Sequence, residues 1–350
     1  DKFDVAQVTG TNNQNGTFTV TSPVAGDVVV TAYAAGLSGS ITLHVKVNVL
    51  DAPTTNTAAT PNLAASAGQI TTFGTRTSPA VGSAATTAGW LYPYANTYFP
   101  LGLLPPALLY NYSVAGGGAV KVSLRYPVNV AATAAVFNYS LIVQEANAIS
   151  QSAGLTANTL DPQVVVPPAA WQAFEQTARG QDADLWIQRL PGSGTLEQAT
   201  RRPIHFVNGQ LKGTVYYNSY SSPQGGNTGA VLSIAPGASS PQLAVQPSGK
   251  CTVCHSINVG GTALIANGPG SNASYSMNQS RRYDLTSGSA PSPSVLNSYD
   301  APLGDVVNVP GDRFTFGAPL TDGAFYMTHG GTAAGDPNFR APPGFSNLSR

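Results

Sequence analysis

The stretch that decides the fold lies at residues 27–47, where two runs, 27–33 (DVVVTAY) and 40–47 (SITLHVKV), flank a turn containing Gly36 and Gly39. Both runs are rich in β-branched residues and have a period of two, which is typical of strands with one buried face. The stretch therefore predicts a β-hairpin.

Runs of the same kind recur along the chain, broken by Gly and Pro. One helix is expected at 168–179, because Pro168 opens the segment, Trp171 and Phe174 share a face with Ala178, and Gly180 follows. The expected fold class is all-β, since the other periodic runs are short and have the period of a strand. Further strands are expected at 17–20, 107–112, 119–125, 140–145 and 185–189.

Composition and periodicity divide the chain into four regions. Residues 1–50 resemble the closing half of a bacterial Ig-like domain, a partial β-sandwich. Residues 51–89 are rich in Thr, Ala, Ser and Gly without periodicity, and are expected to be a linker. Residues 90–205 are expected to form a second β-sandwich that includes the helix, and residues 206–350 contain an internal repeat.

The repeat consists of three matching segments, 213–219 (GTVYYNS), 261–267 (GTALIAN) and 323–329 (GAFYMTH). Each has a Gly and a small residue followed by a hydrophobic strand, and such spacing of hairpins indicates propeller-like repeats. Propellers usually have about four to eight blades, so three repeats do not close a ring and another all-β arrangement stays open.

Both cysteines of the chain fall in one motif, Cys251-Thr252-Val253-Cys254-His255. The spacing Cys-x-x-Cys-His is that of c-type haem attachment, in which two thiols bond the vinyl groups of one porphyrin edge and the next histidine binds the iron. The motif predicts one covalent haem c per chain, with thioether bonds at Cys251 and Cys254 and His255 as an axial ligand.

Three other interpretations of the motif are weaker, and one of them, a short loop disulfide, would not require His255. A redox disulfide of this spacing usually stands where a strand enters a helix in a thioredoxin-like unit, and no such pattern flanks it. A structural zinc site needs four ligands, so Cys251, Cys254 and His255 would need a fourth from a distant histidine or carboxylate.

A six-coordinate electron carrier needs a second axial ligand, His or Met. His329 is the first choice because it ends a strand of the repeat beside a glycine turn, and Met277 follows because it stands in a polar segment. Met327 falls on the strand itself and His205 precedes a strand, so both come after. His44 lies on the alternating run 40–47 and is expected to be a surface residue.

Charged residues make up only 9% of the chain and its net charge is zero, against about 25% charged residues in ordinary soluble domains. A sparse, balanced charge argues against nucleic acid, which needs a basic face, and no apolar stretch is long enough for a transmembrane helix. Because covalent haem is attached outside the bacterial cytoplasm, the motif predicts an exported protein, extracellular or at the cell surface, with the periplasm as an alternative.

Four segments together resemble a poorly characterised group of bacterial surface proteins, of the myxobacterial type, that carry the haem motif in a propeller-like region. The resemblance covers about residues 90–330 and implies an exported, haem-bearing surface protein, but no reaction. The segments are 91–94 (LYPY), 211–220 (LKGTVYYNSY), 229–231 (GAV) and 251–256 (CTVCHS).

Three functions follow as hypotheses. The first is a monohaem surface cytochrome that transfers electrons to redox partner proteins, since the chain has only four histidines and three glutamates for acid–base chemistry. The second is a structural surface protein, fibre subunit or adhesin, which forms a homo-oligomer or filament by sharing strands and in which haem is secondary. The third is a haem peroxidase or gas sensor. Whether the chain is an enzyme stays undecided, and an electron carrier is favoured.

Overall fold

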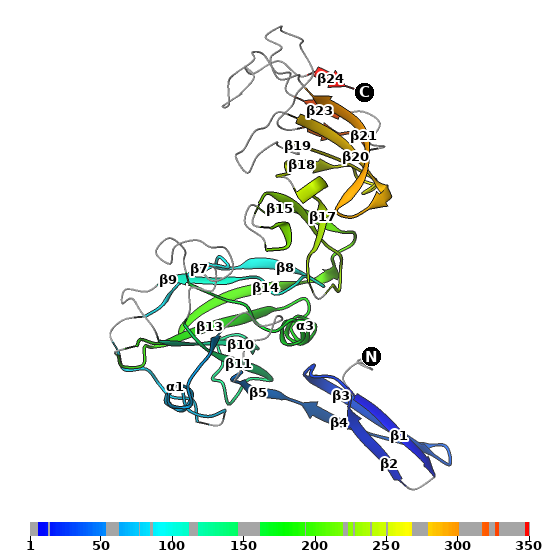
Figure 1. Cartoon of the computed structure of the whole chain (residues 1–350). Coiled ribbons are helices and arrows are strands. Elements are labelled where there is room, and N and C mark those ends of the chain that lie inside the picture. Colours follow the sequence, from blue (N-terminus) through cyan, green and yellow to red (C-terminus); the bar gives the residue numbers. More distant parts are fainter. Residues whose placement is uncertain are drawn as a thin grey trace. The chain divides into compact units, whose positions relative to one another are not determined.

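Figure 1 shows a computed structural model of the chain, in which strands predominate and the described residues form two α-helices. The model has two compact units, residues 1–211 and residues 212–350. The all-β prediction is confirmed at this level. The described residues are 6–12, 15–53, 63–76, 78–84, 87–111, 118–145, 162–192, 194–219, 223–226, 228–238, 240–249, 251–267, 279–300, 317–321, 326–328 and 347–349.

The first unit begins with two separate two-stranded sheets. Strands β1 (Ala6–Asn12) and β2 (Asn15–Val20) form one, and β3 (Gly26–Ala34) and β4 (Leu37–Val45) form the other, as predicted from residues 27–47. His44 on β4 is exposed, as expected, and its Nδ1 lies 2.7 Å from the carboxylate of the cross-strand neighbour Asp27.

The main sheet of this unit has seven strands in the order β5-β11-β10-β13-β14-β8, with β6 also paired to β11. Two of its pairs are parallel, β11 with β5 and β14 with β8. A second sheet of three strands has the order β12-β9-β7. The bounds are β5 Val47–Asp51, β6 Leu63–Ala64, β7 Gly89–Tyr92, β8 Thr97–Leu101, β9 Leu108–Asn111, β10 Ala119–Tyr126, β11 Phe137–Gln144, β12 Gln163–Val164, β13 Asp182–Leu190 and β14 Thr200–Gln210.

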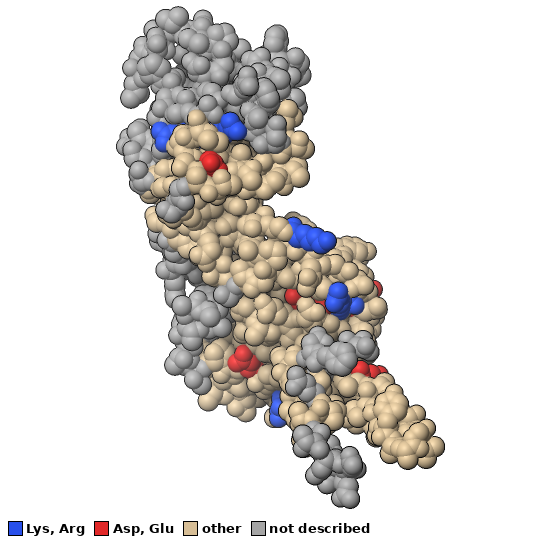
Figure 2. Space-filling view, turned by 90° about the vertical axis from the view of Figure 1, so that its right-hand side faces the viewer, with Lys and Arg blue, Asp and Glu red and all other residues tan. Residues whose placement is uncertain are grey.

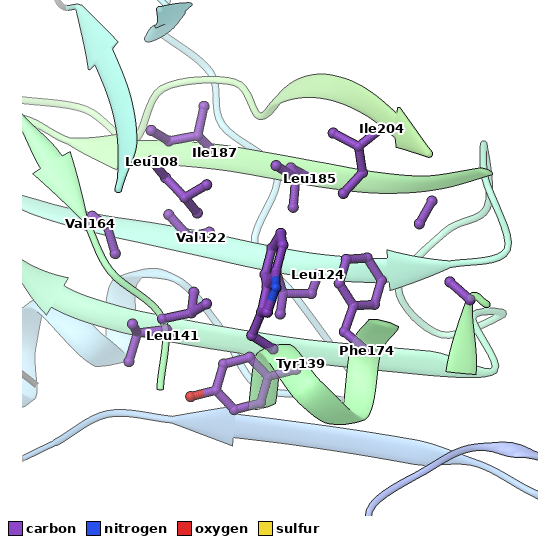
Figure 3. Packing of buried hydrophobic residues seen from close by; sticks show 14 of the residues in the cluster. Leu108, Val122, Leu124, Tyr139, Leu141, Val164, Phe174, Leu185, Ile187 and Ile204 are labelled. Carbon is purple, nitrogen blue, oxygen red and sulfur yellow. The ribbon is translucent and has the colours of Figure 1, made fainter. Parts of the chain in front are cut away.

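The core of the first unit lies between the two sheets and helix α3 (Pro168–Thr177). Trp171 and Phe174 of α3 are fully buried there, and the ring of Phe174 stacks on Phe137 of β11 with the centroids 5.4 Å apart. Figure 3 shows Phe174 beside the inward side chains of β10 and β13, among them Leu124 and Leu185. The predicted helix and its buried aromatic face are confirmed.

Residues 51–89 differ from the expected linker, because part of them packs on the outer face of the main sheet. Helix α1 (Ala67–Thr72) begins at Ser66, whose side chain and that of Gln69 form a reciprocal capping box. Phe73 after the helix is 1% exposed and packs with Ile142 of β11. This burial holds the segment on the sheet despite its low-complexity composition.

The described residues of the second unit form three antiparallel sheets, each a meander of strands adjacent in sequence. The sheets are β15-β16-β17, β18-β19-β20-β21 and β22-β23-β24. The three repeat segments form β15, β19 and β23, but β15 is an edge strand whereas β19 and β23 lie inside their sheets. The bounds are β15 Val215–Ser219, η1 Pro223–Gly225, β16 Ala230–Ile234, β17 Gln242–Val245, η2 Pro247–Gly249, β18 Val253–Ile257, β19 Ala263–Asn267, β20 Gln279–Ser289, β21 Ser292–Asp300, β22 Gly317–Pro319, β23 Tyr326–Thr328 and β24 Asn347–Ser349.

Charged side chains are few on the face shown in Figure 2, where they stand scattered among uncharged residues. Within the part of the chain that the structure describes, neither α-helix has the length and apolar character needed to cross a bilayer.

Candidate functional site

The predicted attachment motif lies at the start of β18 in the second unit. The short helix η2 precedes it, and the N–H of Thr252 donates to the carbonyl of Gly229 at 2.8 Å, just before β16. Thr252 is fully buried. The motif is therefore fixed to the neighbouring sheet β15-β16-β17 as well as to its own.

Cys254 and His255 form a bulge in the ladder between β18 and β19. Val253 pairs with Asn267 and Ser256 pairs with Ile265, so two residues of β18 stand opposite the single residue Ala266. A bulge interrupts the strict alternation of side chains and often re-aims a side chain beside a functional site.

The backbone of Cys254 is in the left-handed region, with φ of 54°. For a residue other than Gly this conformation costs roughly 1–2 kcal/mol, and such residues concentrate at functional sites, where the surrounding structure holds them in place. The strain coincides with the second cysteine of the motif, at the point where the ladder is broken.

His255 is oriented by a side chain from another sheet. Its Nδ1 lies 2.8 Å from Oδ1 of Asn218 on β15. An amide oxygen only accepts, so Nδ1 carries the proton and, in the neutral ring, Nε2 carries the lone pair. In metal-binding histidines, a hydrogen bond of this kind at one ring nitrogen fixes the tautomer of the imidazole.

Burial lowers the pKa of His255 below its ordinary value, while the backbone carbonyl of Tyr216 acts in the opposite direction. The neutral imidazole is the form that binds metal, so the environment favours a histidine ready to coordinate at neutral pH.

The two thiols differ in exposure. Cys251 is partly exposed, whereas Cys254 is 7% exposed, and no disulfide joins them. The sheets β15-β16-β17 and β18-β19-β20-β21 share a small apolar cluster beside the motif, which includes Val231 and Leu264. The described residues thus give a half-buried histidine, oriented by Asn218, directly after two cysteines of the required spacing.

Of the proposed second ligands, His329 and Met277 lie outside the described residues. Met327 is on β23, and its partner strand β22 lies beside β18. His205 lies on β14 of the first unit rather than before a strand; its Nδ1 is 2.7 Å from Asp182 and its ring centroid is 4.7 Å from that of Tyr98.

Sequence reasoning found Cys251, Cys254 and His255 but did not single out Asn218, although it lies in the repeat segment 213–219. No group of three or more His, Cys, Asp and Glu side chains that could hold a metal ion occurs within the described ranges. No family model matches the sequence, and neither a curated protein nor a solved structure matches it.

Proposed function

We propose that the chain is an exported monohaem c-type cytochrome that transfers electrons at the cell surface or in an extracellular assembly. Cys251 and Cys254 would hold the porphyrin through thioether bonds, and His255 would supply a nitrogen ligand to its iron. The observation that carries the proposal is the bond from His255 Nδ1 to Asn218, which leaves Nε2 as the coordinating atom of the neutral ring, directly after the two cysteines.

The chemistry of the three side chains suits this group, whereas the burial of Cys254 does not suit attachment to the folded sheet. Because Cys254 is 7% exposed, its thiol is out of reach in the folded sheet, so attachment precedes the folding of β18 and β19. Haem supplies a one-electron change at its iron, while the bulge at Cys254 and His255 and the amide of Asn218 position the protein's ligand. His329 stays the first proposed distal ligand, followed by Met277, Met327 and His205.

We extend the proposal to the architecture around the motif. The three meander sheets of the second unit are proposed to be propeller-like blades, since a blade is an antiparallel sheet of about four strands and the sheet β18-β19-β20-β21 has this form. The hairpin β3-β4 is proposed to belong to an Ig-like sandwich. Export follows from covalent haem attachment, which takes place outside the cytoplasm.

The test is a reduced-minus-oxidised absorbance spectrum of the protein exported by a host with c-type haem maturation. We expect a low-spin, six-coordinate spectrum that carbon monoxide leaves unchanged. A high-spin spectrum that shifts with carbon monoxide would instead support the peroxidase or gas-sensor function. A protein without haem absorbance would overturn the proposal.

A structural surface or fibre protein is the second candidate function, because the hairpin β3-β4 exposes apolar side chains on both faces. The register places Val29 and Tyr33 on one face and Leu37 and Ile41 on the other. Their exposed fractions are 63%, 81%, 76% and 60%. A two-stranded hairpin with apolar residues on both faces gains stability by assembly with further strands, and a second copy of this chain would build a homo-oligomer or filament.

Light scattering after size exclusion, at several protein concentrations, tests this assembly. The wild-type mass is expected to rise above 35.9 kDa with concentration, while the double variant Tyr33→Ser and Ile41→Ser remains monomeric. As a matched control, Thr42→Ser on the same strand keeps the wild-type behaviour. A wild-type monomer at every concentration would refute assembly through the hairpin and leave the haem proposal standing.

A further inference from the structure

A small cavity on the outer face of the main sheet of the first unit is lined mainly by β5, β10 and β11 and by residues 73–79. Side chains alternate along β10, so Val120, Val122 and Leu124 enter the core while Lys121 and Arg125 face this cavity. Phe73, Gly74, Thr75, Arg76 and Pro79 line the cavity from the opposite side.

The cavity is cationic. Lys121 is 6% exposed, and its Nζ lies 3.4 Å from the carbonyl of Phe73 and 5.4 Å from the centre of that ring. Within the described ranges neither Lys121 nor Arg125 has a carboxylate at ion-pair distance. A buried ammonium has three N–H donors to satisfy, and among the described residues the recorded hydrogen bond of Lys121 is the one to Phe73.

The guanidinium of Arg125 lies over the ring of Trp186, with Cζ 4.9 Å from the centroid. Its Nε is buried and has no hydrogen-bond partner among the described residues. Asp184 is the acidic residue whose negative charge acts on Arg125. Its carboxylate already accepts hydrogen bonds from Nε of Arg201 at 2.7 Å and from the N–H of Asn129 at 2.7 Å.

Burial lowers the pKa of Lys121 to about 8, and the positive charge of Arg125 acts in the same direction. Burial likewise lowers the pKa of Arg125, partly offset by Asp184. Lys121 and Arg125 thus place two like charges on the same desolvated face of β10, which costs free energy that a nearby negative charge would return.

The size of the cavity limits what it can hold. The space open to the centre of a water-sized sphere is about 10 Å³, which is room for roughly one such sphere. A chloride-sized anion fits this space. We propose that this cavity binds a chloride-sized anion between Lys121 and Arg125, and that the anion fastens residues 73–79 to the outer face of the sheet.

The experiment compares chloride with gluconate, an anion too large to enter, in the full chain at equal ionic strength. Chloride is expected to slow hydrogen exchange at residues 73–80 and to raise the Tm of the first unit by about 2–4 °C, with saturation.

Lys121→Met removes one cation while keeping an unbranched side chain one atom shorter, and is expected to abolish the chloride dependence of both readouts. The control Lys46→Met changes an exposed lysine of the same unit and should retain it. Equal exchange rates in chloride and gluconate for the wild type would mean that water occupies the cavity and would overturn the proposal. An undiminished chloride effect in Lys121→Met would overturn it as well, and the wild-type comparison decides the matter even if that variant does not fold.

Discussion

Replacing both Cys251 and Cys254 with alanine is expected to abolish covalent haem entirely. Thioether bonds at these two sulfurs are the only covalent link in a c-type site, and the chain has two cysteines. Haem staining of the exported protein on a denaturing gel, relative to protein stain, measures the loss. The signal is expected to fall to background in the double variant.

Asn218→Leu is the matched comparison, because it keeps both thiols and removes only the acceptor of His255 Nδ1. Haem staining is expected to remain, while the spectrum and reduction potential change, since second-shell partners tune the metal ligand. Haem staining that persists in the double cysteine variant would disprove thioether attachment at this motif. A spectrum unchanged in Asn218→Leu would show that Asn218 does not orient the ligand.

Local patterns were enough to predict helix α3 and seven of the fourteen strands described in the first unit, because period-two runs and the proline-to-glycine limits of the helix are local signals. They did not predict that β5 pairs in parallel with β11, about 90 residues later, since strand partners are chosen by the shared core and not by either strand alone. Helix α1 was missed although Ser66 and Gln69 form a capping box, because its surroundings are of low complexity.

In the candidate site, too, local sequence signals could be predicted and contacts between distant residues could not. The spacing of Cys251, Cys254 and His255 is a local signal and was read directly. Asn218 is 37 residues away and reaches His255 only because β15 lies beside β18. The bulge and the left-handed φ at Cys254 were also unpredictable, since nothing in a non-glycine residue signals that conformation in advance.

A buried carboxyl in α3 gives the largest expected pH effect on stability. Glu175 is 1% exposed, and its Oε1 accepts the N–H of Gly102 at 2.9 Å. Its Oε2 is buried without a hydrogen-bond partner among the described residues. Burial raises the pKa of Glu175 from 4.5 to about 7, while the bond from Gly102 acts in the opposite direction.

The sign of the effect follows from proton uptake. Between pH 4.5 and about 7 the folded chain holds a proton on Glu175 that the unfolded chain has released, so stability falls as pH rises through this window and levels off above it. The full shift of the Glu175 pKa corresponds to a loss of unfolding free energy of at most about 3 kcal/mol. Glu175→Gln mimics the protonated form, so it is expected to be more stable than the wild type above pH 7, with the difference vanishing near pH 4.5.

Urea unfolding followed by tryptophan fluorescence measures this difference, because Trp90, Trp171 and Trp186 all lie in the first unit. Glu145→Gln is the contrasting variant: Glu145 accepts two bonds of 2.6 Å from buried Arg189, and breaking a buried ion pair destabilises. The two Glu→Gln changes are therefore expected to have opposite signs at pH 8. A Glu175→Gln protein less stable than the wild type at pH 8, or a difference constant from pH 4.5 to 8, would show that Glu175 is ionised in the folded chain.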